Sequence, residues 1–232
     1  MAYDLYLFDL DDTLLDFKAS EQLSFVRALG ALGVKATTSM YDSYRNVNEM
    51  LWRMLEQGKT DKEHLKVERF RQTFDVHGIA EDPHAASHHY LEALPQTVVL
   101  MEGAKEACAY FSARGEIGII TNGIGHVQMQ RITNSGIAEY ISFISVSDQC
   151  GYAKPDVRFF EYTVAKAKKF DKARTVMIGD RVDADIEGAQ RFGIDSCWFN
   201  PHHLPYTLER PPTYEVSHLS QLRAMLTVTE PA

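Results

Sequence analysis

The sequence predicts an α/β protein in which a doubly wound parallel sheet carries an inserted helical domain. Short apolar runs alternate with helical patterns along most of the chain, which is typical of parallel βαβ units. One long stretch near the N-terminus has only the helical period. The chain has 232 residues, 45% of them hydrophobic and 24% charged, which suits one globular core with a smaller appended module.

Five apolar runs have the length and composition of strands. They are residues 3–10, 116–121, 142–146, 175–179 and 196–199. The closing PPTYEVSHLSQL predicts a turn, a short edge strand and a final helix with Leu219 and Leu222 on its apolar face. Ligands of doubly wound sheets bind outside the carboxyl ends of the strands. The polar residues that end these runs are therefore the candidates for function.

Residues 17–94 are expected to be helical. Apolar side chains recur there near the helical period, namely Tyr44, Val47, Leu51, Met54 and Leu55, followed by Val67, Phe70 and Phe74. No strand signal of comparable strength interrupts this stretch. We therefore expect a sheet domain formed by residues 1–16 and 95–232 and a helical cap domain formed by residues 17–94. Because two crossings join the domains, the cap can move as a lid.

The composition restricts the classes of partner. A formal net charge of -8 argues against a nucleic-acid-binding protein, although local cations and a metal can still hold a small anionic substrate. Three widely spaced cysteines, Cys108, Cys150 and Cys197, fit neither a disulfide framework nor a zinc cluster. The first residues do not resemble a signal peptide, and no apolar stretch is long enough to span a bilayer. We expect a soluble cytoplasmic protein, with its oligomeric state left open.

The segment DLDDT follows the first apolar run directly. If extended backbone persists there, Asp9 and Asp11 point to one side while Asp12 points away. Two close carboxylates repel each other unless a cation or a proton separates their roles, so the pair favours either Mg²⁺ or a shared proton. The alternative is that these acidic residues only terminate a strand or cap the next helix.

Two later segments place polar groups after predicted strands. In GIITNG, the Thr121 hydroxyl and the backbone N–H groups near Asn122 can hold phosphate oxygens, although an Asn-Gly turn is also a common structural feature. In GYAKPD, Pro155 biases Lys154 toward an extended loop, where its ammonium group can balance a carboxylate and an incoming phosphate. The alternative for Lys154 is a solvated surface position.

The segment VMIGDRVDAD runs from an apolar strand through Gly179 into several acidic residues. Glycine permits close packing at the strand end, and Asp180 lies where a metal ligand is expected. The alternative is that these acidic side chains cap the following helix, and we expect such capping for Asp183.

DLDDT, the Thr121 strand end, Lys154 with Pro155, and GDRVDAD resemble, in this order, the four motifs of the haloacid dehalogenase superfamily. The resemblance spans nearly the whole chain. It implies a Rossmann-like doubly wound core with a helical cap inserted after the first motif. It also implies that Asp9 is the nucleophile and Asp11 the general acid/base, and that Thr121 binds phosphate while Lys154 balances charge.

The resemblance further implies a Mg²⁺ cofactor held by Asp9, Asp180 and the backbone carbonyl of Asp11. Asp185 resembles the second acid of the last motif, which supports the metal or the lysine. Arg181 departs from the small polar residue often found at its position, so its role stays open. With Thr121 and Lys154, Asn122 is expected to stabilise charge on the transferring phosphoryl group.

Three further segments, VNEMLW, CWFNPHH and PTYEVSHLSQL, are similar to those of the cytoplasmic 5′-nucleotidases that act on pyrimidine and non-standard nucleoside monophosphates. The resemblance implies a Mg²⁺-dependent phosphomonoester hydrolase that forms an aspartyl-phosphate and acts on a small metabolite, a nucleoside 5′-monophosphate. The alternatives on the same fold are a sugar-phosphate or phosphoglycolate phosphatase, a phosphomutase and, ranked lower, a dehalogenase. The non-enzyme alternative is a metal- or phosphoester-binding regulatory module.

Some aromatic and polar residues of the cap are candidates for contact with the leaving group. Phe17, Asn48 and Trp52 have suitable chemistry for a nucleobase, but helical spacing favours packing inside the cap for Trp52. His202 and His203 are adjacent in the sequence, so their side chains diverge and we expect a loop role for both.

Overall fold

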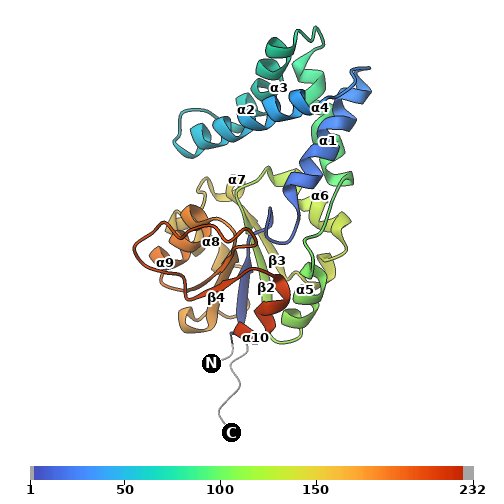
Figure 1. Cartoon of the computed structure of the whole chain (residues 1–232). Helices are drawn as coiled ribbons and strands as arrows, with labels where there is room; N and C mark the ends of the chain where they lie inside the picture. Colours follow the sequence, from blue (N-terminus) through green and yellow to red (C-terminus); the bar gives the residue numbers. More distant parts are fainter. Residues whose placement is uncertain (1–2, 227–232) are drawn as a thin grey trace. The chain divides into compact units, whose positions relative to one another are not determined.

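A computed structural model describes residues 3–226 of the chain (Figure 1). The chain divides into two compact units. The first comprises the residues up to Phe17 together with those from Val99 onward, and the second comprises Lys18–Val98. The helices of the second unit carry the blue to green colours of Figure 1 that follow the first strand. Each unit has its own hydrophobic core.

The first unit is built on a six-stranded sheet. Its strands are β1 (Leu5–Phe8), β2 (Glu116–Thr121), β3 (Phe143–Val146), β4 (Thr175–Gly179), β5 (Asp195–Phe199) and β6 (Tyr214–Val216). Every neighbouring pair is parallel, and the strand order is β3-β2-β1-β4-β5-β6. Strand β1 lies between β2 and β4, so the chain adds strands first on one side of β1 and then on the other. The carboxyl ends of β1 and β4 therefore flank the switch point where such sheets bind ligands.

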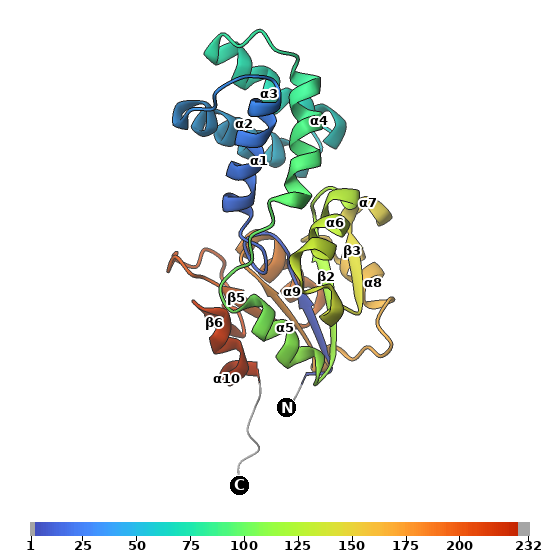
Figure 2. The same ribbon diagram turned by 90° about the vertical axis from the view of Figure 1, so that its right-hand side faces the viewer.

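Helices cover both faces of this sheet. They are α5 (Ala104–Ser112), α6 (Gly125–Ser135), α7 (Ser147–Cys150), α8 (Val157–Val164), α9 (Glu187–Phe192) and α10 (Leu222–Leu226), with a π-helical turn at Val182–Ile186 and short 3-10 turns at Ala138–Tyr140, Lys172–Arg174 and Leu219–Gln221. In Figures 1 and 2, α5 and α6 lie on one face of the sheet and α8 and α9 on the other. The fold class expected from the sequence is confirmed.

The central strand β1 is buried on both faces because its side chains alternate between two helical layers. Leu5 and Leu7 pack in the cluster that contains Phe160 of α8 and Phe192 of α9. Tyr6 faces the other layer, where its ring centroid lies 4.5 Å from that of Phe111. This double burial explains why the first run of the sequence is continuously apolar.

The observed strands differ from the expected ones mainly at β1. The run 3–10 was expected to be extended throughout, but β1 ends at Phe8. Asp11 instead forms an isolated bridge with Leu15, and Asp12 adopts a left-handed φ of 57°. At the other end of the unit, the expected short edge strand is β6, and Leu219 and Leu222 are buried as expected.

The second unit consists of four helices. They are α1 (Phe17–Ala31), of which all but the first residue belong to this unit, α2 (Thr38–Glu56), α3 (Lys62–His77) and α4 (Pro83–Ala93), which a 3-10 turn at Leu94–Gln96 extends. The side chains of Thr37, Asp61 and Asp82 accept hydrogen bonds from backbone N–H groups and thereby start α2, α3 and α4. Gly78 ends α3 in a left-handed conformation.

Aromatic rings fill the interior of the second unit. The ring of Tyr44 lies 4.8 Å from that of Phe25, 5.0 Å from that of Phe70 and 5.7 Å from that of Tyr90. The buried guanidinium group of Arg69 lies 4.5 Å from the centre of the Tyr90 ring. Cation–π attraction partly offsets the cost of burying this charge.

Asn48, a candidate for substrate contact in the sequence, lies inside the second unit. Its amide nitrogen donates to Glu21 over 2.8 Å, and its amide oxygen accepts from Arg69 over 3.2 Å. With 4% of its surface exposed, Asn48 links a buried acid to a buried base. Trp52 is half-buried, and the Lys62 ammonium lies 5.9 Å from its ring centre.

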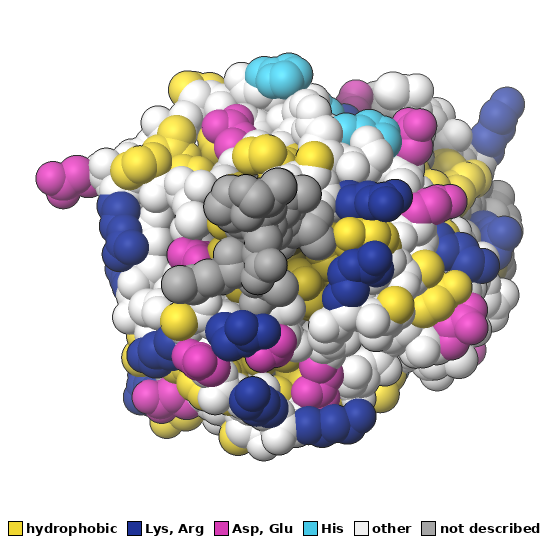
Figure 3. Space-filling model, turned by 90° about the horizontal axis from the view of Figure 1, so that it is seen from below, with side chains coloured by type: hydrophobic (Ala, Val, Ile, Leu, Met, Phe, Trp, Pro, Cys, Tyr) yellow, Lys and Arg dark blue, Asp and Glu magenta, His cyan; other side chains and the backbone are white. Residues whose placement is uncertain are grey.

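One face of the molecule is mixed in charge. Figure 3 shows Lys and Arg side chains interspersed with Asp and Glu side chains on the face that it displays. This distribution differs from the concentrated basic surface that nucleic-acid binding requires. Among the described residues, no helix is long and apolar enough to cross a membrane.

Candidate active site

The loop after β1 brings acidic side chains to the switch point of the sheet. The backbone N–H of Asp9 donates to the carbonyl of Ile178 in β4 over 2.9 Å, which places Asp9 at the end of the strand pair. The Asp12 carboxylate accepts the backbone N–H of Phe17 over 2.9 Å and so starts α1. Asp9 therefore lies at the site, whereas Asp12 stabilises the start of the helix that follows the loop.

Lys154 lies at the centre of the site. Its ammonium group pairs with the carboxylate of Asp9, pairs with that of Asp185 over 2.7 Å and donates to the carbonyl of Ile120 over 2.7 Å. Only 5% of Lys154 is exposed, so the solvated surface position considered from the sequence is wrong. The two carboxylates offset the cost of burying the Lys154 ammonium.

Asn122 holds the backbone of Lys154 in place. Its amide oxygen accepts the Lys154 N–H over 2.9 Å, and its amide nitrogen donates to the Lys154 carbonyl over 3.1 Å. The sequence suggested that Asn122 stabilises the phosphoryl group. In the structure its side-chain amide holds the loop that carries the lysine, and its role toward a phosphoryl group stays a prediction.

The end of β4 contributes two more acidic side chains. Asp180 directly follows the strand, and its carboxylate accepts the hydroxyl of Thr13 over 3.2 Å. Asp185 lies in the π-helical turn, where its carboxylate accepts the backbone N–H of Arg181 over 3.0 Å. The capping role expected for Asp183 is wrong, because the π-helical turn has no capping hydrogen bond from a side chain, and Asp183 forms an exposed ion pair with Arg181 over 2.6 Å.

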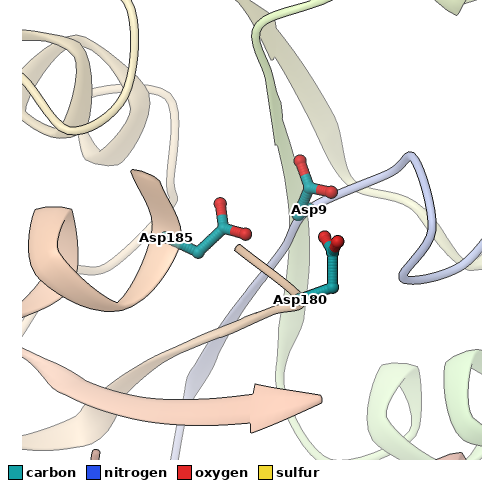
Figure 4. Close-up of side chains that lie close together, drawn as sticks. All are labelled: Asp9, Asp180 and Asp185. Carbon is teal, nitrogen blue, oxygen red and sulfur yellow. The ribbon is translucent and has the colours of Figure 1, made fainter. Parts of the chain in front are cut away.

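Three carboxylates meet at this point. Figure 4 shows Asp9, Asp180 and Asp185 gathered where β1 and β4 end, and one oxygen of each lies within 4.8 Å of the others. Lys154 supplies one positive charge against these three acids. An excess of closely spaced anionic oxygen ligands suits a hard divalent cation such as Mg²⁺. The residues present therefore fit the metal that the sequence motifs imply.

Asp11 lies in a second network next to the first. Its carboxylate accepts the side-chain amide of Gln128 over 2.6 Å and pairs with the guanidinium of Arg131. The same amide of Gln128 donates to the hydroxyl of Thr121 over 2.9 Å. Asp9 and Asp180 directly follow β1 and β4, Thr121 ends β2, and Lys154 precedes α8. These four residues and Asp11 thus converge on one edge of the sheet.

Comparison with known proteins identifies the family. Residues 6–199 match the family described as haloacid dehalogenase-like hydrolase, which is well over half of the chain. The chain belongs to the haloacid dehalogenase-like hydrolases. The expectation of an enzyme of the hydrolase class is thereby confirmed.

The hydrolase has relatives of similar length. It is 33% identical to YfnB, a HAD-family protein of Bacillus subtilis, over 97% of this chain and 96% of that one. It is 36% identical to the pyrimidine 5′-nucleotidase PynA of Streptococcus pneumoniae, with 93% and 92% covered. It is 29% identical to the pyrimidine 5′-nucleotidase YjjG of Escherichia coli, with 97% and 99% covered. These relatives agree with the subfamily resemblance noted from the sequence.

A crystal structure of YfnB from Bacillus subtilis, bound to magnesium, resembles the hydrolase over 98% of this chain and 100% of that one. The TM-score is 0.91 at 32% identity. The L-2-haloacid dehalogenase from Xanthobacter autotrophicus has a TM-score of 0.75 at 16% identity, a likeness that shows the common fold alone.

The electrostatics of the hydrolase site follow from burial. Burial above all, together with the charges of Asp185 and Asp11, raises the pKa of the Asp9 carboxyl to about 7 against the opposing effect of Lys154. Burial, Asp9 and Asp185 likewise hold the pKa of Asp180 well above its usual range. Burial opposes the charge of Lys154, but Asp185 and Asp9 outweigh it and raise its pKa. The site thus has unbalanced negative charge, which a bound cation would relieve.

Gln128 and Arg131 are absent from the sequence-based site. They lie three residues apart in α6, on the same buried face as Val127 and Ile132. Two polar residues on the apolar face of the helix after the Thr121 strand are the signal that could have found them.

Gly179 leaves no space for a side chain. A Cβ atom there would lie 2.2 Å from an oxygen of Asp185. We expect Gly179→Ala to displace Asp185 from Lys154, to lower activity about 10-fold or more and to lower the free energy of unfolding by about 1–3 kcal/mol.

Phosphate-release kinetics and denaturant unfolding measure the two effects. Gly30→Ala is the matched control, because no atom lies within 4 Å of a Cβ atom added at Gly30. Equal behaviour of the two variants would contradict the steric role of Gly179.

Proposed function

We propose that this hydrolase is a Mg²⁺-dependent phosphomonoesterase that uses Asp9 as a covalent nucleophile. The observation that carries this proposal is the buried pairing of Asp9 with Lys154 beside Asp180 and Asp185. A carboxylate held by an ammonium group, next to further carboxylates, can approach an anionic phosphate only when additional positive charge is present. The same arrangement therefore accounts for the nucleophile and for the metal.

The carboxylates of Asp9 and Asp180 are the proposed metal ligands, together with the backbone carbonyl of Asp11. When bound, Mg²⁺ supplies positive charge that offsets the repulsion between Asp9 and the substrate phosphate. Asp185 pairs with Lys154 and fixes the position of its ammonium group beside Asp9. Asp185 thus supports the site through the lysine.

The reaction has two halves. In the first, a carboxylate oxygen of Asp9 attacks phosphorus, the bond from phosphorus to the leaving oxygen breaks, and protonated Asp11 transfers its proton to that oxygen. In the second, water attacks the phosphorus of the aspartyl-phosphate and gives its proton to Asp11. The phosphorus–Asp9 bond breaks, inorganic phosphate leaves, and both carboxyl groups return to their starting states.

The charge on the transferring phosphoryl group is balanced by groups already held in place. Lys154 is fixed by two carboxylates and the Ile120 carbonyl, so it needs little reorganisation during the reaction. The Thr121 hydroxyl lies at the end of the adjacent strand β2 and is proposed to donate to a phosphate oxygen.

Nucleoside 5′-monophosphates are the proposed substrates, with the pyrimidine series first. Support comes from PynA and YjjG, which are named pyrimidine 5′-nucleotidases and align with nearly the whole chain. The helical unit Lys18–Val98 is proposed to act as the cap that selects the leaving group and excludes water. The structure of YfnB with magnesium, which reveals interdomain movement in that protein, supports a mobile cap.

Phosphate release tests this proposal. The purified protein is assayed with pyrimidine and purine nucleoside monophosphates, sugar phosphates and phosphoglycolate, with Mg²⁺ and with a chelator. We expect turnover that requires the metal and is fastest for a pyrimidine nucleotide. Preference for a sugar phosphate would replace the substrate but keep the chemistry, and transfer to a sugar phosphate instead of water would indicate a phosphomutase. Absence of turnover on the whole panel would refute the proposal.

A further inference from the structure

We propose that Gln128 and Arg131 are positioning residues that orient the proton-transferring carboxyl of Asp11 and the hydroxyl of Thr121 together. The inference rests on the proposed function, because it concerns how the same site is prepared for reaction. It extends that function to α6, a helix outside the four sequence motifs of the site. The contacts form a continuous chain from Thr121 through Gln128 and Asp11 to Arg131.

Arg131 determines which way the Gln128 amide faces. Its guanidinium group can only donate, and it lies 2.8 Å from the amide oxygen of Gln128. The NH₂ group of Gln128 must then face away from Arg131, where it has two acceptors. These are Asp11 at 2.6 Å and Thr121 at 2.9 Å. The reversed amide would place its oxygen against the Asp11 carboxylate and its NH₂ group against a cation.

The Thr121 hydroxyl is oriented by the same amide. Its oxygen accepts from Gln128 and also from the backbone N–H of Gly123 over 3.2 Å. An oxygen that accepts twice keeps its own hydrogen for donation. The network thus directs the Thr121 O–H toward an acceptor such as a phosphate oxygen.

Asp11 is held through both of its carboxylate oxygens. Gln128 donates to one oxygen and Arg131 to the other. Holding both oxygens fixes the rotation of the carboxyl group, so the remaining lone pairs point in defined directions. General acid–base transfer requires such alignment, and a small misplacement of the carboxyl is costly.

The burial of Gln128 and Arg131 indicates that their network does more than stabilise the fold. Arg131 is fully buried and Gln128 is 2% exposed. The Arg131 guanidinium lies 5.3 Å from the ring centre of Phe17, which adds a second constraint on its orientation. Apolar residues at such positions usually stabilise a fold as well as a buried ion pair does. The need to orient Asp11 and Thr121 explains why Gln128 and Arg131 are polar residues at buried positions.

The Gly123 backbone fits closely around Gln128. A Cβ atom at Gly123 would lie 2.2 Å from the amide nitrogen of Gln128. The loop after β2 therefore has room for this amide only because the residue there is glycine.

The test compares Gln128→Met with Gln130→Met. Both changes replace the same side chain in α6, but Gln130 is exposed and serves as the matched control. For each variant, kcat/KM is measured with a nucleoside monophosphate and with aryl phosphates whose leaving groups are increasingly acidic. This parameter reports the steps up to cleavage of the ester bond, in which Asp11 donates its proton.

We expect Gln128→Met to lower kcat/KM about 10- to 100-fold for the nucleotide, whose alkoxide leaving group needs a proton. The loss should shrink as the aryl leaving group becomes more acidic, since such groups leave without help. Gln130→Met should match the wild type throughout. A uniform loss across the series would show that Gln128 does not act on proton transfer by Asp11 and would overturn the inference, as would an unchanged or higher rate for the nucleotide.

Arg131→Lys and Arg131→Met provide a second pair if Gln128→Met does not fold. Lysine keeps a positive charge beside Asp11, but its flexible side chain does not hold a donor rigidly in place, as the guanidinium does for the one nitrogen that donates to both Asp11 and Gln128. We expect the selective loss for the nucleotide to be smaller in Arg131→Lys than in Arg131→Met. Equal losses in the two variants would contradict the inference.

A structural readout separates this inference from the proposed function. Crystal structures of the wild type and of the folded variant should show the Asp11 carboxyl in a different rotamer in the variant, with Asp9 unmoved. An unmoved Asp11 overturns the inference whether or not the protein turns over any phosphoester. A wild type that is inactive on every phosphoester refutes the proposed function, while the Asp11 rotamer still decides the inference.

Discussion

Asp9→Asn is expected to abolish Mg²⁺-dependent phosphate release, lowering kcat by at least about 10⁴-fold. The amide is a poor nucleophile and removes one of the carboxylates proposed to hold the metal. Lys154 keeps Asp185 as a partner at 2.7 Å, so its charge stays compensated and the fold should persist. Phosphate release with a nucleoside monophosphate measures the loss, and thermal unfolding measures the fold.

Asp12→Asn is the matched control for this experiment. It makes the same chemical change three residues away, at a side chain that accepts the Phe17 N–H and starts α1. Asparagine can accept the same hydrogen bond and tolerates the left-handed φ of 57° at this position. We expect Asp12→Asn to keep nearly full activity. Substantial phosphate release by a folded Asp9→Asn protein would remove Asp9 as the nucleophile.

Asp11→Asn should separate the two halves of the reaction. With a nucleoside monophosphate, the loss of the proton donor should lower kcat/KM by about 10²–10⁴-fold. With p-nitrophenyl phosphate, whose leaving group needs no proton, Asp9 should still be phosphorylated. Water attack on the phosphorus then lacks its base, so the aspartyl-phosphate should accumulate.

Rapid-mixing measurement of nitrophenolate shows this behaviour directly. We expect a burst of about one equivalent per enzyme molecule, followed by slow turnover in Asp11→Asn. Wild-type protein, which hydrolyses the intermediate quickly, should show a smaller burst or none. Equal loss of the first turnover for both substrates would contradict the assignment of Asp11 as the proton-transferring group.

Most of the fold could be predicted from the sequence because the central strands are buried on both faces. A segment such as LYLF, between two helical layers, must be apolar throughout, and its end is marked by the first acidic residue. The strand ends in turn located Asp9, Thr121 and Asp180. Parallel strands place their carboxyl ends at one edge, so these residues could be expected to converge without knowledge of side-chain packing.

Side-chain partners could not be predicted in the same way, because they depend on packing between distant segments. The side-chain amide of Asn122 holds the backbone of Lys154, a contact that its residue type alone does not predict. Asn48 has the chemistry of a nucleobase contact, but Glu21 and Arg69 engage it inside the second unit. In both cases, the residue type indicated a polar contact, but the partner of that contact depends on how distant segments pack.

Local backbone geometry after β1 was also hard to predict. The sequence analysis aligned Asp9 with Asp11 on the condition that extended backbone continues past Phe8, where β1 ends. Asp11 instead bridges to Leu15, and its orientation comes from Gln128 and Arg131. The two-residue period of side-chain direction in a strand does not predict the turn in the loop after β1. It also does not predict that Gln128 and Arg131 of α6 reach Asp11.

The covalent intermediate is the central claim, and borohydride trapping tests it most directly. Asp11→Asn is mixed with p-nitrophenyl phosphate and Mg²⁺, quenched and treated with borohydride, which reduces an acyl phosphate to an alcohol. Peptide mass spectrometry should then find homoserine at position 9, in proportion to the nitrophenolate burst. An intact Asp9 after a full burst, or reduction at a different carboxylate, would contradict the account.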